Sequence, residues 1–345
     1  MKRLILIAIA FLITIIEAAS QTFTVRLNDG NQLCFHVTDT TSREAEIIRI
    51  KVLGNMQPSH PSGDLSIPSY VNYKGINYAV SSIGESTFAG ADGLTSISIP
   101  SSVKRISDKA FSGCSNLKSV VFPNRTPLFG ENVFEQCTSV SALSFGSDWT
   151  TIDLHQFADA ISLKEVFIPS RVTKITGVKS IASLEKITVD SNNKAFSTSD
   201  GMLYSKDGIT LYACPRAKKG AVSILPGTEI ILDGAFSDCF YIENILLPAS
   251  IHEFAYDEFV GCKKLNRIIL LSEIPPMTAK WNGATVFAIA APNQDCILQV
   301  NKKHLKRYQT NICSVEGVYE TLNANRKADI VSGKMMSKAS IKKAK

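Results

Sequence analysis

The sequence lacks the motifs of common catalytic, nucleotide-binding and metal sites. Its 345 residues contain no G-x-S-x-G nucleophile motif, no P-loop and no G-x-G-x-x-G loop. The five histidines are scattered without H-x-x-x-H spacing, and the eight cysteines form no C-x-x-C pair. We therefore expect no cofactor, no metal and no enzymatic activity.

Most of the chain also lacks an excess of charge of either sign. The net charge is +6, but the positive residues gather at the two ends. Lys2 and Arg3 begin the chain, and residues 323–345 hold seven Lys or Arg and one Asp. The remainder is close to neutral and slightly negative, so it offers no basic groove for nucleic acid, and we expect no nucleic-acid partner.

Long apolar runs are absent except at the N-terminus. Leu4–Ile16 is an apolar stretch of 13 residues, which follows two basic residues and precedes the small residues 18–20. This order is typical of a secretory signal peptide, and the run is shorter than the ~20 residues that span a bilayer. We expect cleavage near Ser20/Gln21, no integral membrane span, and a secreted or cell-surface location.

What the sequence does contain is an internal repeat with a period of about 23 residues. Blocks of the form apolar-x-x-apolar-x-apolar begin at Leu94, Leu117, Val140 and Leu163, and the same phase returns at Ile242 and Leu265. One column of phenylalanines and one of small residues run in phase with these blocks. The predicted core column is Phe88, Phe111, Cys114, Phe134, Cys137, Phe157, Phe236, Cys239, Phe259 and Cys262. Two columns in phase indicate coils that stack on one another.

Each coil is predicted to contain a short strand, a turn often marked by Pro, a second apolar contact and a compact A-F-x-x-C segment. Strand side chains alternate between faces, so Ile97 and Ile99 should point inward while Ser96 and Ser98 point outward. Successive coils should pair these strands in parallel. A single coil buries too few side chains to fold alone, so stability requires stacking.

The expected organisation has five parts. They are a signal peptide (1–20), a β N-terminal cap (21–63), a repeat solenoid (64–271) with a hairpin insert (190–219) that projects from the stack, a mixed C-terminal cap (272–322) and a basic flexible tail (323–345). Caps are physically expected because an uncovered coil exposes unpaired backbone and apolar surface.

The block LTSISIPSSVKRISDKAFSGCSN, residues 94–116, resembles the BspA-type leucine-rich repeats, a family of bacterial surface and secreted proteins. The insert and the ending IPPM…CILQV are also similar to elements of that family. The block at Leu163 departs by losing two residues and its A-F pair, and the block at Val140 has Gly146 in place of Pro. The expected fold is a β-rich leucine-rich-repeat solenoid, a right-handed superhelix with a parallel sheet on one face. The resemblance implies an extracellular protein that binds through its exposed sheet face, and it implies no chemistry.

The cysteine column permits two interpretations. Thiols stacked one coil apart would suit a disulfide ladder or a soft-metal site. Alternatively they are small buried hydrophobes, which we favour because Ala91 and Ala160 occupy the same column. Cys296 and Cys313 flank a short predicted helix, and a disulfide between them would close a loop, as an exported protein permits.

The candidate ligand-binding residues are outward positions of the later strands. The early coils present small hydroxyl side chains there, whereas later coils add apolar and charged ones, and exposed apolar residues within a polar rim mark interaction sites. The set is Glu165, Phe167, Lys186, Asn244, Leu246, Arg267 and Ile269. β-propensity alone also places such residues on strands, so this interpretation stays open.

Three functions follow from these patterns. The favoured one is a non-enzymatic binding or adhesion module that recognises an extracellular protein, on a host matrix or another cell surface. The alternative is a glycan-binding module, for which Tyr204, Tyr212 and Phe167 would supply the aromatic platform. A hydrolase has the least support, since no acid and base groups converge in the pattern.

Overall fold

A computed structural model of the chain describes residues 21–48, 60–255, 258–277, 279–281, 284–286, 296–304, 306–308 and 330–333. The expected signal peptide lies outside these residues. The chain divides into two compact units. Unit 1 contains the described residues up to Trp149 together with Gln156–Ser162, and unit 2 contains Thr150–His155 and the described residues from Leu163 onward.

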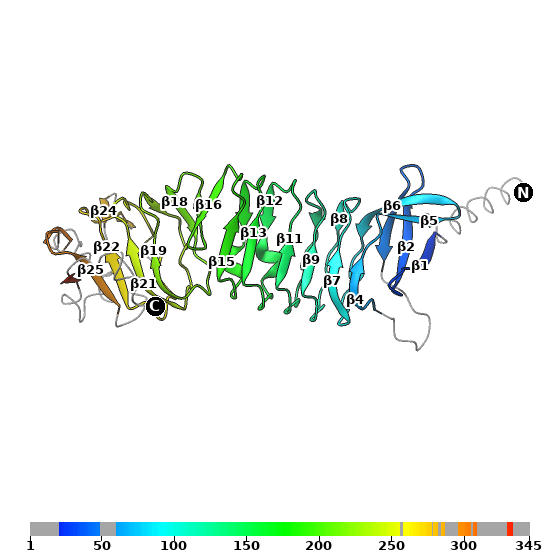
Figure 1. Ribbon diagram of the computed structural model, residues 1–345, viewed down its shortest axis with the longest axis horizontal. Coiled ribbons are helices and arrows are strands. Elements are labelled where there is room, and N and C mark those ends of the chain that lie inside the picture. Colours follow the sequence, from blue (N-terminus) through cyan, green and yellow to red (C-terminus); the bar gives the residue numbers. More distant parts are fainter. Residues whose placement is uncertain are drawn as a thin grey trace, which may run out of the picture. The chain divides into compact units, whose positions relative to one another are not determined.

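Unit 1 is built from two sheets (Figure 1). The larger contains β1 (Thr22–Arg26), β2 (Gln32–Asp39), β3 (Glu44–Ile48), β5 (Tyr70–Tyr73), β6 (Ile76–Ile83), β8 (Arg105–Ile106) and β10 (Leu128–Phe129). The smaller contains β4 (Gly63–Ser66), β7 (Leu94–Ser98), β9 (Ser119–Val121) and β11 (Ala142–Ser144). The second apolar contact expected in each coil is thus itself a short strand, which adds a second parallel ladder through β6, β8 and β10.

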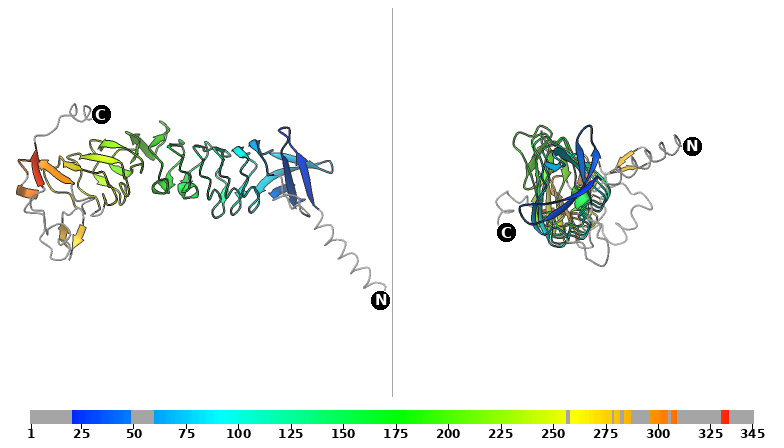
Figure 2. Two further views of the ribbon diagram at one scale, coloured as in Figure 1. Left: turned by 90° about the horizontal axis from the view of Figure 1, so that it is seen from below. Right: turned by 90° about the vertical axis from the view of Figure 1, so that its right-hand side faces the viewer.

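The first three strands are antiparallel neighbours, and Figure 2 shows them in blue. Strand β3 then pairs in parallel with β6, so the antiparallel strands continue directly into the repeat's own sheet. The inner side chains of β2 and β3, including Phe35, Ala45 and Ile47, are buried. The N-terminal segment therefore contributes to the same core as the coils.

The parallel pairing predicted for the coils of unit 1 is confirmed. Ile97 of β7 lies opposite Val120 of β9, which in turn lies opposite Leu143 of β11, so each partner stands one full repeat further along the chain. Ile97 and Val120 are buried, whereas Ser96 and Ser119 on the other face are partly exposed. The register follows from the alternation, because a slip of one residue would turn every apolar side chain outward.

The phenylalanines of unit 1 form a continuous stack inside the coils. Phe88 and Phe111 lie 5.1 Å apart between ring centroids, as do Phe111 and Phe134, and Phe134 and Phe157 lie 4.8 Å apart. All four rings are at most 2% exposed. Each ring thus packs its faces against the equivalent ring of the neighbouring coils, which stabilises coil stacking beyond burial alone.

The cysteines that follow these phenylalanines are free, buried thiols. The Cys114 Sγ donates to the carbonyl oxygen of Phe88 at 3.1 Å, and the Cys137 Sγ donates to that of Phe111 at 3.2 Å. The hydrogen bond to the Cys114 thiol and burial raise the pKa of Cys137. The side chains are therefore small core residues with one added donor, and no disulfide ladder forms among the described cysteines. Cys313 lies outside the described residues, so its bridge to Cys296 stays a prediction.

Gly146 replaces the turn proline of its coil because no side chain fits there. A Cβ atom at this position would lie 2.2 Å from the carbonyl oxygen of Pro123 and 2.3 Å from the Cα of Asn124. Both are backbone atoms, which cannot move away as a flexible side chain would.

We expect Gly146→Ala to destabilise unit 1 by about 1–3 kcal/mol, the usual cost of overpacking. Chemical unfolding followed by circular dichroism measures the change. Gly90→Ala is a useful contrast: no atom lies within 4 Å of its added Cβ, although its φ of 73° adds backbone strain. A stable Gly146→Ala protein would mean that the turn at Pro123 can shift.

Unit 2 begins with two pairs of parallel strands. They are β12 (Thr151–Asp153) with β14 (Lys174–Thr176) and β13 (Glu165–Ile168) with β15 (Lys186–Val189). Ile152 lies opposite Ile175, one full repeat on, whereas Val166 lies opposite Ile187, which is two positions short of a full repeat. The two missing residues therefore fall between Thr176 and Lys186, where a 3-10 turn, η2 (Val178–Ser180), replaces the A-F segment.

The hairpin insert forms, but it does not project from the stack. Strands β16 (Phe196–Ser199), β17 (Met202–Ser205) and β18 (Thr210–Ala213) pair antiparallel, and β18 also pairs in parallel with β20 (Ile230–Ile231). The Met202 and Leu211 side chains are fully buried, because both strands carry apolar residues that the stack can cover. The buried Asn193 fixes the start of the insert, with hydrogen bonds to the carbonyl oxygens of Pro169 and Val172 and from two backbone N–H groups.

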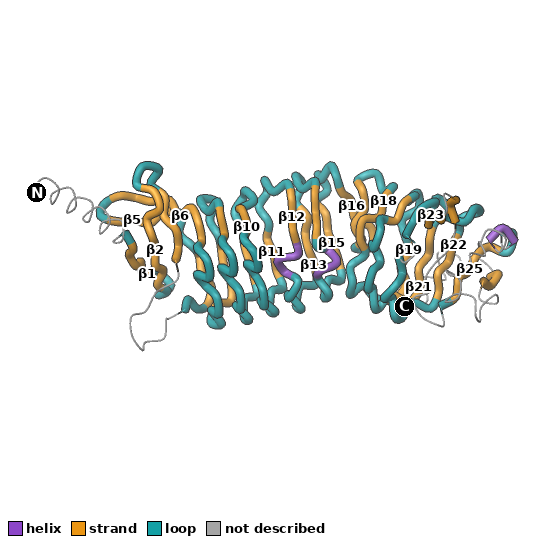
Figure 3. The backbone as a smooth tube through the Cα atoms, turned by 180° about the vertical axis from the view of Figure 1, so that it is seen from behind, coloured by secondary structure: helices purple, strands orange, loops and turns teal. Residues whose placement is uncertain are grey.

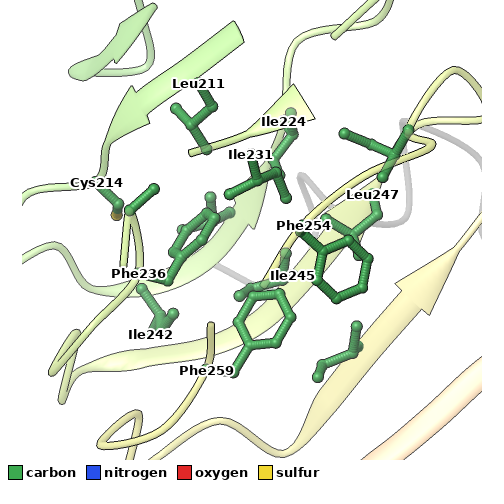
Figure 4. Close-up of a cluster of buried hydrophobic side chains, with 14 of the residues drawn as sticks. Leu211, Cys214, Ile224, Ile231, Phe236, Ile242, Ile245, Leu247, Phe254 and Phe259 are labelled. Carbon is green, nitrogen blue, oxygen red and sulfur yellow. The ribbon is translucent and has the colours of Figure 1, made fainter. Parts of the chain in front are cut away.

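The second sheet of unit 2 continues the repeat. It runs in the order β19 (Gly220–Ser223), β21 (Ile242–Leu247), β22 (Arg267–Leu270), β25 (Ile297–Asn301) and β26 (Ile330–Gly333). Beneath it lies a cluster of buried apolar side chains that includes Phe236, Ile245 and Phe259 (Figure 4). Strand β26 belongs to the segment expected to be a flexible tail. Its parallel pairing with β25 corrects that expectation for residues 330–333, where consecutive β-branched residues suit a strand.

Helical structure is scarce in the described residues (Figure 3). It consists of η1 (Leu154–Phe157), η2 and the helical residues 306–308. A two-stranded hairpin, β23 (Ala279–Trp281) with β24 (Ala284–Val286), completes the described strands. In the region expected to be a C-terminal cap, the Tyr308 hydroxyl donates to the Ser272 carbonyl oxygen at 3.0 Å.

Candidate functional site

The first group of candidate residues lies on β13 and β15, on the face of the sheet away from the core. Val166 and Ile168 are buried, so Glu165 and Phe167, which alternate with them along the strand, point outward. Phe167 is 48% exposed. It pairs across the strands with Thr188, and Glu165 pairs with Lys186. These three candidate residues therefore share one small surface.

The two charged members of this group neutralise each other. The Lys186 Nζ lies 3.0 Å from the Glu165 Oε1, and both side chains are about half exposed. The hydrogen bond from Lys186, with a smaller one from Thr188, holds the pKa of Glu165 below its usual range. Glu165 is therefore ionised at neutral pH, and the pair presents little net charge to a partner.

The second group lies on β21 and β22. Asn244 is opposite Arg267, and Leu246 is opposite Ile269, so four candidate residues form two cross-strand pairs. All four are partly exposed, while Ile245 and Ile268 between them are buried. The pairing is parallel, which places like positions of successive coils side by side.

The hairpin insert lies between the two groups along the stack. The Ile187 N–H of β15 donates to the Gly201 carbonyl oxygen at 2.9 Å, where a following coil would otherwise pair. In the part of the chain that the structure describes, β15 has no ladder to β19. The sequence suggests one patch from Phe167 to Ile269, but the structure shows two.

A model of the BspA type leucine rich repeat region matches the sequence in six copies over residues 76–200 and 212–281. These ranges cover more than half of the chain and most of its parallel strands. The chain belongs to the BspA-type leucine-rich repeat family.

Solved structures of leucine-rich repeat proteins resemble this BspA-type chain at low sequence identity. The pneumococcal vaccine antigen PcpA is 16% identical over 91% of this chain and 99% of that one, with a TM-score of 0.47. A protein from Eubacterium ventriosum is 22% identical over 81% of this chain and 78% of that one, with a TM-score of 0.45. A protein from Bacteroides ovatus is 20% identical over 81% of this chain and 80% of that one, with a TM-score of 0.44. No curated protein is significantly similar in sequence.

Tyr204 cannot contribute to the aromatic platform suggested for glycan binding on this BspA-type chain. Tyr204 is fully buried, and its hydroxyl accepts a hydrogen bond from the Leu225 N–H at 3.3 Å. Burial raises its pKa above the usual range. Tyr212 is 37% exposed and meets Phe196 edge to face. Tyr204 points inward because β17, expected to project, belongs to the core.

A set of basic and aromatic residues beside the second group was not among the predicted site residues. Arg216 and Lys263 each lie over the Phe240 ring, at 5.4 and 5.1 Å from its centroid, and Lys264 lies over the Tyr241 ring at 5.5 Å. Arg216 lies in the segment that leads into β19, Phe240 and Tyr241 directly precede β21, and Lys263 and Lys264 lie in the segment that leads into β22. The signal in the sequence is a basic doublet just before each of two strands, at 218–219 and 263–264, with the aromatic pair 240–241 before the strand between them.

Within the described ranges, no three His, Cys, Asp or Glu side chains gather closely enough to hold a metal ion. Nor does any described helix have the length and apolar character needed to cross a membrane.

Proposed function

We propose that this BspA-type protein is an exported, non-enzymatic binding or adhesion module that recognises an extracellular protein through the exposed face of its sheets. The scaffold would be a right-handed superhelix of about 23 residues per coil, closed by caps at 21–63 and 272–322. The signal-like pattern of residues 1–20 supports export to the cell surface or beyond.

The observation that carries this proposal is the exposed Phe167 on an otherwise regular strand. Both neighbours of Phe167 are buried, its backbone is fixed by pairing with β15, and nearly half of its surface meets solvent. Burying such a ring in an interface releases about 25 cal/mol per Å² of apolar area. A rigid aromatic side chain also loses little conformational entropy on binding, which is why aromatic residues are enriched among interface hot spots.

We expect Phe167→Asp and Leu246→Asp, each made in the mature chain from Gln21 onward, to weaken partner binding at least about tenfold without unfolding the protein. A carboxylate at either position loses the apolar contact and is costly to desolvate. A partner is first isolated from extracellular fluid with the wild-type chain, and binding of each variant is then measured by biolayer interferometry.

Val121→Asp is the matched control. Val121 is 42% exposed on β9 of unit 1, so the substitution has the same character on a similar strand. Its binding should equal that of the wild type. If both Phe167→Asp and Leu246→Asp bind as tightly as the wild type, the sheet face of unit 2 is not the binding surface.

A further inference from the structure

A short line of residues crosses the strands of unit 2 at their N-terminal ends. Lys219 immediately precedes β19, Tyr241 precedes β21, and Lys264 stands just before Leu265 and β22. Gly220 pairs with Ile242, and the Gly220 N–H donates to the Tyr241 carbonyl oxygen at 3.1 Å, so Lys219 and Tyr241 are neighbours. Lys264 lies over the Tyr241 ring. We call Lys219, Tyr241 and Lys264, with Phe240 and Lys263 beside them, the basic–aromatic row.

Cations occupy the ring faces of this row. Phe240 is contacted by both Arg216 and Lys263, and Tyr241 by Lys264. A cation over a ring face is held there by the ring quadrupole. Tyr241, Lys263 and Lys264 are exposed. The row therefore presents positive charge in a defined position rather than on freely rotating side chains.

Most nearby cations outside the row already have carboxylate partners. Arg216 lies 3.2 Å from Asp238, and Lys218 lies 3.1 Å from Asp200. Within the row, Lys219 is 3.7 Å from Glu185, at the long end of an ion pair.

Lys264 has no carboxylate within ion-pair distance among the described residues, and the same holds for Arg267 on the adjoining strand. The segments 216–223, 240–247 and 263–270 together hold six Lys or Arg and one acidic residue, Glu243. Positive charge therefore predominates in these segments, on a chain whose repeat body is close to neutral.

We propose that the basic–aromatic row binds an acidic, extended peptide segment of the partner protein. Neighbouring strands are about 4.8 Å apart, so Lys219 and Lys264, two strands apart, are separated by roughly 10 Å. An extended chain advances about 3.3 Å per residue and its side chains alternate between faces, so acidic side chains two or four positions apart, at about 7 or 13 Å, share one face and bracket this spacing. This inference rests on the proposed function, because it names the chemistry of the partner for the same face.

The contacts favour a peptide over a polysaccharide. Stacking of a sugar requires a free aromatic face, but two cations lie over the Phe240 ring and one lies over the Tyr241 ring. Five residues further along the same two strands lie the half-buried Leu246 and Ile269, which offer apolar surface that a sulfated sugar chain does not use. A peptide supplies both carboxylates and apolar groups.

The test uses fluorescently labelled poly-L-glutamate as the probe, with the mature chain from Gln21 onward and fluorescence anisotropy as the measurement. We expect binding at low salt that weakens steeply as salt is raised, because exposed charges are screened. The double variant Lys219→Glu/Lys264→Glu should bind about tenfold more weakly or worse. Lys118→Glu/Lys174→Glu reverses two exposed lysines outside the row and should bind as the wild type does.

Three outcomes would overturn the inference. They are no binding of poly-L-glutamate by the wild type, equal binding by the row variant and the wild type, and binding of heparin in preference to poly-L-glutamate. The last would assign the row to sulfated polysaccharides. The probe is independent of the natural partner, so failure here leaves the tests with Phe167→Asp and Leu246→Asp unaffected. Equally, failure of those tests would not remove binding to the row.

Discussion

Replacing Phe111 with Ala is expected to destabilise unit 1 by about 4 kcal/mol, which is the usual cost of truncating a buried phenylalanine. Phe111 is fully buried and is stacked on both faces, against Phe88 and Phe134 at 5.1 Å each. The substitution leaves a cavity between two rings and removes both aromatic contacts, each worth about 0.5–1.5 kcal/mol beyond area burial. Urea unfolding followed by circular dichroism measures the loss.

Phe167→Ala is the matched control, because it removes the same side chain from an exposed position. We expect its free energy of unfolding to change by less than about 0.5 kcal/mol. A small effect at Phe111 would mean that the stacked rings do not hold the coils together.

The stability of unit 2 is expected to fall as the pH rises from about 4.5 to about 8, because of Glu258. This carboxyl group is fully buried, and burial raises its pKa to about 8 despite hydrogen bonds from the Phe236 N–H at 2.6 Å and the Gly234 N–H at 2.9 Å. The folded state therefore holds its proton more tightly than the unfolded state does. Glu258 opposes folding progressively through this window, and each pKa unit corresponds to about 1.4 kcal/mol.

Glu258→Gln should remove this pH dependence, because the amide does not titrate. The measurement is the melting temperature of the wild type and the variant at several pH values from 4 to 9. The wild type should lose stability toward alkaline pH relative to Glu258→Gln, and the loss should level off above about pH 8. Parallel curves for the two proteins would show that Glu258 keeps its ordinary pKa.

The repeated parts of the fold were predictable because the same apolar pattern recurs several times in the sequence. Leu94, Leu117 and Val140 each begin the same pattern, so the parallel pairing of β7, β9 and β11 follows from alternation and phase alone. The burial of the phenylalanine column follows in the same way. Where the repeat is present, each coil makes the same contacts with its neighbours, so the periodicity of the sequence is sufficient to predict strand pairing and burial.

The parts that appear once could not be read from periodicity. The hairpin insert was expected to project, because nothing in β17 itself says that Tyr204 meets a core built by residues of later coils. Glu258 was also unforeseen. It stands directly before the core Phe259, where Ala110 precedes Phe111 in unit 1. Only the structure shows that its carboxyl group accepts hydrogen bonds from backbone N–H groups of the preceding coil.

For the candidate binding residues, the sequence predicted which face of the strand each side chain occupies but not which residues it contacts. Alternation correctly places Phe167 and Leu246 on the outer side of their strands. It does not show that Glu165 and Lys186 pair, because that depends on the register between β13 and β15. Nor does it show that Lys263 and Lys264 lie over Phe240 and Tyr241, which belong to a different coil.

The junction between Phe88 and Phe111 is nearly identical to that between Phe111 and Phe134, both in ring spacing and in the thiol that donates to the preceding phenylalanine's carbonyl. A coil that packs against its own duplicate in the same way as against its present neighbour can be duplicated or deleted by recombination without creating a new kind of contact. The length of the stack can therefore evolve by whole coils, while the contacts in its interior stay constant.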